Sequence, residues 1–145
     1  MTAAMTRNSA PSPALASTAL VRLVAIRPAT PASTPVKPNA KVLTEAELVA
    51  VALPCLCEFV WVLRKVYGIE AADAATAIRA LIGAANVEMN RPAVEAGLAV
   101  LDAGGDFADG VIAYEGSWLG GKTFVSFDKS AVALAAAQGL PARLL

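Results

Sequence analysis

From residue 44 onward, short apolar runs alternate with amphipathic segments along the chain. The apolar run LVAVA (48–52) predicts a buried strand, and KTFVSF (122–127) predicts another. Apolar residues at helical spacing, with proline in a first turn or glycine after a last turn, predict helices. The predicted helices span 54–68, 70–85, 91–105, 106–120 and 129–138, and two further short strands span 87–89 and 142–145. Strands separated by helices indicate an α/β fold with a mainly parallel sheet that is covered on both faces.

The first 41 residues have a different pattern. They are rich in Ala, Ser, Thr and Pro, and RPATPASTPVKPN (27–39) is typical of an extended or disordered linker. All twelve acidic residues lie at or after Glu45, so residues 45–145 combine twelve acidic with seven basic side chains, a balance of minus five. We therefore divide the chain into a basic leader, 1–41, and an acidic domain, 42–145.

The composition excludes several classes of enzyme. Histidine is absent, which rules out a Ser-His-Asp triad, a Cys-His pair and an ordinary zinc enzyme. Cys55 and Cys57 are separated by one residue, and without further ligands this spacing is typical of reduced core cysteines in a cytoplasmic protein. No apolar run reaches the ~20 residues of a membrane-spanning helix, and no segment has the pattern of a secretory signal. Carboxylates are then the groups expected to carry any catalysis.

Residues 116–123, GSWLGGKT, match the phosphate-loop pattern G-x-x-x-x-G-K-[ST] at every position. That loop works only between a preceding strand and a following helix, because the amides at the helix N-terminus hold the phosphates. Here a predicted helix precedes the motif and a predicted strand follows it. We therefore interpret Gly120 and Gly121 as a helix stop and a turn, and we do not expect a nucleotide site.

Glu58 lies inside the apolar segment LPCLCEFVWVLRKVYG (53–68). A carboxylate that is kept away from water has a raised pKa unless another group compensates for its charge. On a helix, the neighbours three and four residues away are all uncharged: Pro54, Cys55, Trp61 and Val62. The sequence therefore predicts that a group beyond this helix compensates for Glu58.

Three further acids lie at the starts of predicted helices. Asp106 and Asp109 are three residues apart, so they share one helix face. Asp128 follows the strand at 122–127, and the carboxyl ends of parallel strands are where open sheets bind ligands. Taken singly, Asp106 and Asp128 are typical helix caps, and Asp109 is a typical first-turn partner of the helix dipole. Together with Glu58 they predict a carboxylate cluster, which requires a hard cation such as Mg²⁺ or Mn²⁺.

Three blocks of the sequence resemble the PIN-domain family, and within it the VapC-like toxins. In chain order they read LPCLCEFVWVLRKVYGI, GGDFADGVIAYE and KTFVSFDKSA, and the resemblance covers about residues 42–145. It implies a three-layer α/β/α sandwich with a central, mainly parallel sheet, one or two Mg²⁺ or Mn²⁺ ions, and cleavage of RNA. It assigns catalytic and metal-binding roles to Glu58, Asp109 and Asp128, with Asp106 as a supporting metal ligand. It also implies a homodimer and a VapB-like antitoxin.

The leader departs from the family pattern. ASTALVRLV (16–24) resembles the first PIN segment, but it places Ala16 where the family has its first metal-binding aspartate. We therefore expect a metal-dependent endoribonuclease whose activity is impaired. The alternative is a catalytically degenerate PIN module that acts by dimerisation or antitoxin binding. Arg64 and Lys65 are either RNA contacts or part of a solvated face, and we expect Trp61 in the core.

Overall fold

The computed structural model describes residues 25–28 and 40–145 of the chain. All the helices and strands predicted after residue 44 are present, with small shifts of their ends, and β1 and α2 are additions. In chain order the elements are β1 (Ala25–Pro28), α2 (Ala40–Glu45), β2 (Ala46–Ala50), α3 (Leu53–Lys65), α4 (Ala71–Gly83), β3 (Val87–Glu88), α5 (Arg91–Asp102), α6 (Phe107–Trp118), β4 (Phe124–Ser126), α7 (Lys129–Ala137) and β5 (Ala142–Leu144). The predicted mixture of helices with short parallel strands is therefore confirmed.

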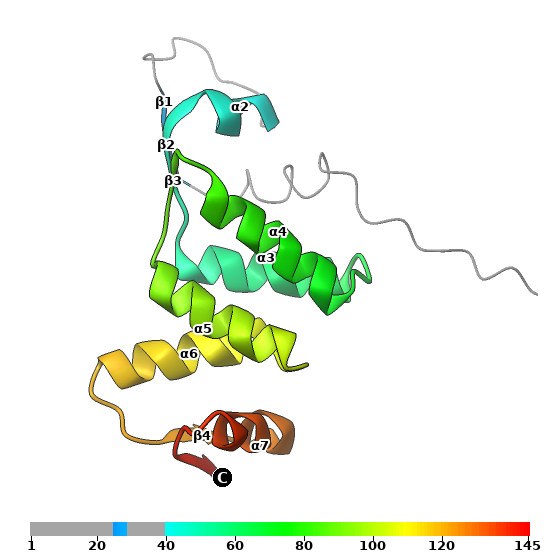
Figure 1. Cartoon of the computed structure of the whole chain (residues 1–145), viewed down its shortest axis with the longest axis vertical. Helices are drawn as coiled ribbons and strands as arrows, with labels where there is room; N and C mark the ends of the chain where they lie inside the picture. The colour runs from blue at the N-terminus through cyan, green and yellow to red at the C-terminus, as the bar shows by residue number, and fades with distance from the viewer. Residues whose placement is uncertain (1–24, 29–39) are drawn as a thin grey trace, which may run out of the picture.

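The described strands form two small sheets, where the sequence predicted one central sheet (Figure 1). In the first sheet, β2 pairs in parallel with β3 and antiparallel with β1, so that Ile26 lies opposite Val49. In the second, β4 and β5 pair in parallel. Both edges of β2 are occupied by β1 and β3, so β4 has no edge of β2 to join. The leader thus contributes one strand to the domain, through β1.

Four helices pack as a closed group between the two sheets (Figure 1). Helix α3 contacts α4, α4 contacts α5, α5 contacts α6, and α6 returns to α3. Burying one large apolar side chain stabilises a fold by roughly 1.5–3 kcal/mol. The largest fully buried side chains come from all four helices and from β2: Phe59, Phe107, Leu56, Ile78, Leu101, Val49 and Val94. Within the described ranges, no helix has both the length and the apolar character needed to cross a membrane.

Helices α5 and α6 approach so closely that both need glycine at the contact. A Cβ atom added to Gly110 would lie 2.8 Å from the Cα of Gly97, in the backbone of α5. A Cβ atom added to Gly97 would lie 2.7 Å from the ring of Phe107, at the start of α6. Because glycine has no side chain, the two backbones can touch. This contact fixes the N-terminal turn of α6, where two of the predicted site acids lie.

The C-terminal segment forms a small β4–α7–β5 unit at the far end of the molecule from β1 (Figure 1). The buried residues of α7 are Ala131 and Ala135, so this unit adds little to the main core. Leu134 of α7 packs against Gly105, in the turn between α5 and α6. The unit therefore meets the rest of the fold near the start of α6.

The GSWLGGKT motif forms a helix end, as the sequence predicted. Helix α6 stops at Trp118, and Gly120 has a φ of 97°, a conformation that favours glycine. The amide of Gly121 donates a hydrogen bond to the carbonyl oxygen of Gly116 at 2.8 Å. Strand β4 follows, so no helix N-terminus is present after the motif to hold a phosphate.

Candidate functional site

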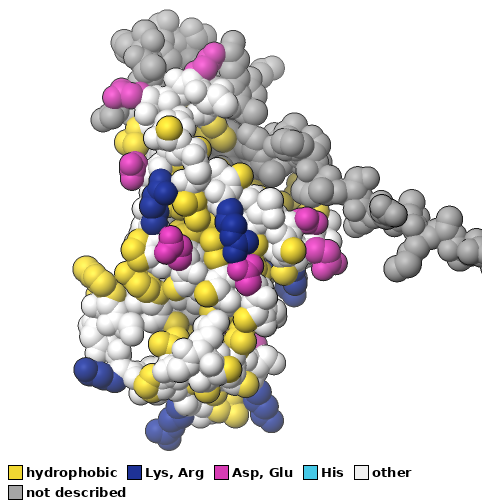
Figure 2. Space-filling model, in the orientation of Figure 1, with side chains coloured by type: hydrophobic (Ala, Val, Ile, Leu, Met, Phe, Trp, Pro, Cys, Tyr) yellow, Lys and Arg dark blue, Asp and Glu magenta, His cyan; other side chains and the backbone are white. Residues whose placement is uncertain are grey.

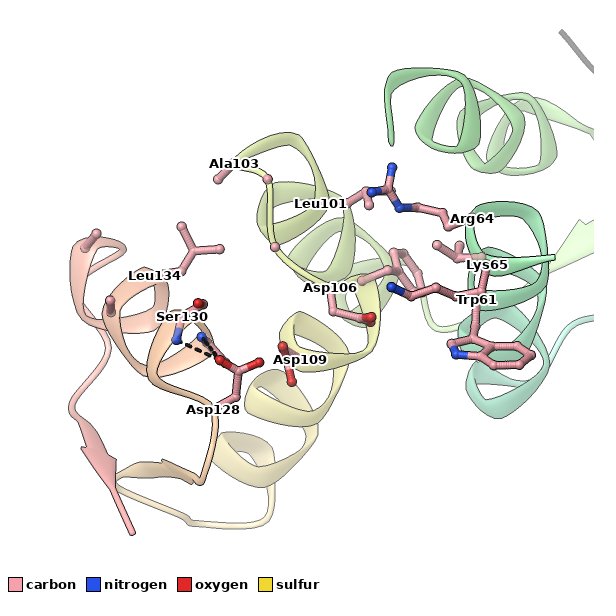
Figure 3. A pocket seen from close by; sticks show the side chains of 17 residues that line it. Trp61, Arg64, Lys65, Leu101, Ala103, Asp106, Asp109, Asp128, Ser130 and Leu134 are labelled. Atoms are coloured by element: carbon pink, nitrogen blue, oxygen red, sulfur yellow. Dashed lines mark hydrogen bonds between the residues drawn. The ribbon is translucent and has the colours of Figure 1, made fainter. Parts of the chain in front are cut away.

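A cavity of about 550 Å³ lies between α3, the turn after α5, and the starts of α6 and α7 (Figure 3). Three of the four predicted site acids, Asp106, Asp109 and Asp128, line it together. Arg64 and Lys65, at the end of α3, also line it. The cavity therefore has acidic groups from α6 and α7 and basic groups from α3.

Asp106 and Asp128 are the N-caps of α6 and α7, which confirms their local interpretation as helix caps. Oδ1 of Asp106 accepts a hydrogen bond from the amide of Ala108 at 2.8 Å. Oδ1 of Asp128 accepts one from the amide of Ser130 at 2.7 Å. These bonds hold both carboxylates at the cavity wall and engage one oxygen of each, which leaves the second oxygen for a ligand.

Asp109 lies in the first turn of α6, and its side chain is half-buried. In the view of Figure 3 its carboxylate lies between those of Asp106 and Asp128. Burial raises the pKa of Asp109 above its ordinary value, and the negative charges of Asp106 and Asp128 raise it further. The three acids thus interact electrostatically, although Asp128 belongs to a different helix from Asp106 and Asp109. A carboxylate with a raised pKa in a cavity is a frequent mark of a functional site.

Glu58 does not join these acids. Its side chain is exposed to solvent, and it does not line the cavity. The expectation that Glu58 is kept away from water is therefore wrong, since water itself compensates for its charge. The buried face of α3 is formed by other residues: Leu56, Phe59, Val60 and Leu63. These residues have the i, i+3, i+4, i+7 spacing of a buried helix face, and Glu58 lies on the opposite face, so the sequence pattern could have indicated its exposure.

The sequence also misplaced Trp61, which we expected in the core. Trp61 is 54% exposed and lines the cavity beside Arg64 and Lys65. A signal for this grouping was present in the sequence, because positions 61, 64 and 65 lie on one face of a helix. Ser130 is a further cavity residue that sequence reasoning missed, and its amide donates a hydrogen bond to Asp128.

The two cysteines lie against the core, in agreement with their prediction as core residues. Cys55 and Cys57 form no disulfide, and both are partly buried against the core. Burial raises the pKa of the Cys57 thiol, and the negative charge of Asp106 raises it further. The thiol form is the unreactive one, so Cys57 is not suited to act as a nucleophile.

The acids of the cavity suit a divalent cation in their chemistry. Carboxylate oxygens are hard donors that Mg²⁺ and Mn²⁺ prefer, and Mg²⁺ commonly takes only one or two carboxylates besides water. In the part of the chain that the structure describes, no three acidic or cysteine side chains are close enough together to bind one ion directly. Direct binding by one or two carboxylates, with water bridging to the third, is the arrangement that these residues allow. Ala16, at the predicted position of a missing aspartate, lies outside the described residues.

The resemblance to the PIN-domain family rests on three sequence blocks, and the structure locates them on α3, on α6 with the turn before it, and on β4 with α7. The second and third blocks supply the acids of the cavity, and the first supplies its basic wall. No protein-family model matches the chain, and neither curated proteins nor solved structures give a significant match to it. Membership of the family therefore stays a prediction.

Proposed function

We propose that this protein is a Mg²⁺- or Mn²⁺-dependent endoribonuclease of the VapC type. The observation that carries this proposal is the shared cavity in which Asp106, Asp109 and Asp128 face a wall containing Arg64 and Lys65. Cleavage of a phosphodiester by metal-activated water needs carboxylates for the cation and positive charge for the phosphates. We also propose that the fold is a divergent form of the PIN-like three-layer α/β/α sandwich, in which the sheet is divided in two, and the parallel pairing of β2 with β3 and of β4 with β5 supports this.

Four charged residues of the cavity have roles in this proposal. A divalent cation bound here would supply a water of lowered pKa and would stabilise negative charge on the phosphate. Asp109, whose pKa is raised by burial and further by the charges of Asp106 and Asp128, would bind the cation. Asp106 and Asp128 are held rigidly by their capping hydrogen bonds, and they orient water around it. Arg64 attracts the RNA backbone, which the net negative charge of residues 45–145 would otherwise repel.

The first test measures cleavage of a fluorescently labelled RNA with Mn²⁺ and with EDTA. We expect weak cleavage by the unaltered chain and stronger Mn²⁺-dependent cleavage by the Ala16→Asp variant, because the added carboxylate completes the ligand set of the family. In the Ala16→Asp background, Asp128→Asn should lower the rate by roughly a hundredfold. Rapid cleavage by the unaltered chain would contradict the expected impairment. No cleavage by either chain would contradict the ribonuclease proposal itself.

A second candidate function is a catalytically degenerate PIN module that forms a homodimer or binds a VapB-like antitoxin in the cytoplasm. It is favoured by large hydrophobic side chains that are exposed around β4 and the end of α6. Phe127 is 81% exposed, Leu119 77% and Trp118 75%. Figure 2 shows hydrophobic side chains at the surface of this part of the molecule. Large apolar side chains that are exposed to this extent are a feature of protein–protein interfaces.

The homodimer is tested by sedimentation velocity. We expect the unaltered chain to sediment as a dimer and Phe127→Glu to sediment as a monomer, because a charge in an apolar interface is left unpaired. Tyr67→Glu is the matched control, since Tyr67 is an exposed aromatic residue, at 46%, that lies after α3 and away from β4. A monomeric unaltered chain, or dissociation by both substitutions alike, would contradict this surface as the interface.

A further inference from the structure

One wall of the cavity combines an exposed aromatic side chain with two cations. Trp61, Arg64 and Lys65 all line the cavity from α3, and their spacing of three and four residues places them on one helix face. Figure 3 shows their side chains extending from α3 on the opposite side of the cavity from Asp128. We call these three residues the α3 lip.

The helix dipole explains only part of this arrangement. Arg64 and Lys65 lie in the last turn of α3, where cations complement the negative end of the helix. The dipole gives no reason for a tryptophan that leaves 54% of its surface in contact with water, since tryptophan is usually well buried. The other aromatic side chain of this helix, Phe59, is 2% exposed. An indole beside two cations at the rim of a cavity is instead the combination that binds single-stranded nucleic acid, by stacking on bases and attracting phosphates.

We propose that the α3 lip binds single-stranded RNA, with the indole of Trp61 stacked on an unpaired base and with Arg64 and Lys65 contacting the phosphates beside it. This inference rests on the proposed ribonuclease function and adds the residues that hold the RNA strand. The strand has to be unpaired at this point, because a base inside a duplex offers no free face to the indole. The acids of the cavity repel phosphate when no cation is bound. The lip therefore has to supply the attraction that holds the RNA over the acids.

The first experiment measures binding of a short, labelled, single-stranded oligoadenylate by fluorescence anisotropy. All proteins carry Asp128→Asn, so that the RNA stays intact, and Mg²⁺ is present. We expect Trp61→Ala to weaken binding by roughly tenfold, which is the effect of losing one stacked base, and Trp61→Phe to retain most of the affinity. Tyr67→Ala is the matched control, because Tyr67 is 46% exposed but lies outside the cavity, and it should leave affinity unchanged.

The cations are tested through the salt dependence of the same binding. Each lost phosphate contact should reduce the slope of log affinity against log salt by about 0.7 for a single strand. We expect this reduction for Arg64→Ala and for Lys65→Ala. Lys122→Ala is the control, because Lys122 is exposed and lies outside the cavity, and its slope should match that of the parent protein.

A direct reading of stacking is available because the chain contains two tryptophans. The Trp118→Phe variant keeps Trp61 as its single tryptophan, so its intrinsic fluorescence reports on the α3 lip. We expect the oligoadenylate to quench this fluorescence, and we expect a duplex of the same length to cause little quenching and to bind more weakly.

The outcomes separate the α3 lip from the ribonuclease proposal. Equal affinity of the Trp61→Ala and parent proteins, absence of quenching, or equal affinity for duplex and single strand would each overturn the lip. If the Ala16→Asp chain cleaves RNA with a KM that Trp61→Ala leaves unchanged, the lip fails and the ribonuclease stands. If binding depends on Trp61 but no variant cleaves RNA, the lip stands as an RNA-binding surface and the ribonuclease fails.

Discussion

Replacing Gly110 by alanine should lower the free energy of unfolding by about 3 kcal/mol, because the added methyl group has no space. Its Cβ would lie 2.8 Å from the Cα of Gly97 and 2.9 Å from the carbonyl carbon of Ala96. Both atoms belong to the backbone of α5, which cannot move aside as a flexible side chain can. Thermal unfolding followed by circular dichroism should show a fall in Tm on the order of 10 °C. Separation of α5 from α6 would also displace Asp109 and so weaken the response to Mn²⁺.

Gly116 provides the matched control on the same helix. A Cβ atom added there has no atom within 4 Å, so only the conformational effect of the substitution remains. Alanine is favoured over glycine inside a helix by roughly 0.5–1 kcal/mol, and Gly116→Ala should therefore raise Tm slightly. Equal destabilisation by the two substitutions, or a neutral Gly110→Ala, would show that α5 and α6 are not in the close contact described above.

Replacing Asp109 by asparagine should make the protein more stable at neutral pH, with a rise in Tm of a few degrees. Because the pKa of Asp109 is raised in the folded state, folding favours the protonated carboxyl group. The stability that this preference provides is present at low pH and is lost as the pH rises through the raised pKa. Asparagine is neutral at every pH and escapes this loss. The difference in Tm between variant and parent should therefore vanish at low pH, below the ordinary value of 3.8, grow as the pH rises through the raised pKa, and stay constant above it.

The same substitution should abolish stabilisation by Mn²⁺, measured as the shift in Tm on adding the ion. It removes the carboxylate whose negative charge is repelled by those of Asp106 and Asp128 and which a bound cation would therefore stabilise. Glu58→Gln is the control with the same chemical change. Glu58 is exposed and does not line the cavity, so this variant should keep both the parent Tm and the parent Mn²⁺ response. If Glu58→Gln instead removed the Mn²⁺ response and Asp109→Asn preserved it, the metal site would lie outside the described cavity.

Most helix ends could be predicted from the sequence, because the proline, glycine and capping residues that set them act over only a few residues. Proline in the first turn marks the start of α3. Gly120, which follows the end of α6, has a backbone conformation that favours glycine. The capping bonds of Asp106 and Asp128 reach only two or three residues along the chain. These two acids could therefore be placed at helix starts before any tertiary contact was known.

The pairing of strands could not be predicted in the same way. Pairing depends on contacts between distant residues, such as Ile26 with Val49, and no local pattern shows that β1 occupies an edge of β2. The tertiary structure thus decided that the described strands form two sheets. It also decided that Asp109 meets Asp128 across the cavity, because the packing of α5 on α6 and the contact of Leu134 with Gly105 bring the starts of α6 and α7 together.

Glu58 and Trp61 of α3 show most clearly what the sequence determined and what the tertiary structure determined. The sequence by itself established that Glu58 and Trp61 lie on one helix and that its other residues are mostly apolar. The spacing of its apolar residues places Glu58 opposite the buried face, but only the tertiary structure decided that Trp61 lines a cavity and Glu58 does not. The physical reason is that the other walls of the cavity come from parts of the chain that are distant in sequence from α3. Its orientation is set by the helices against which it packs, here α4 and α6.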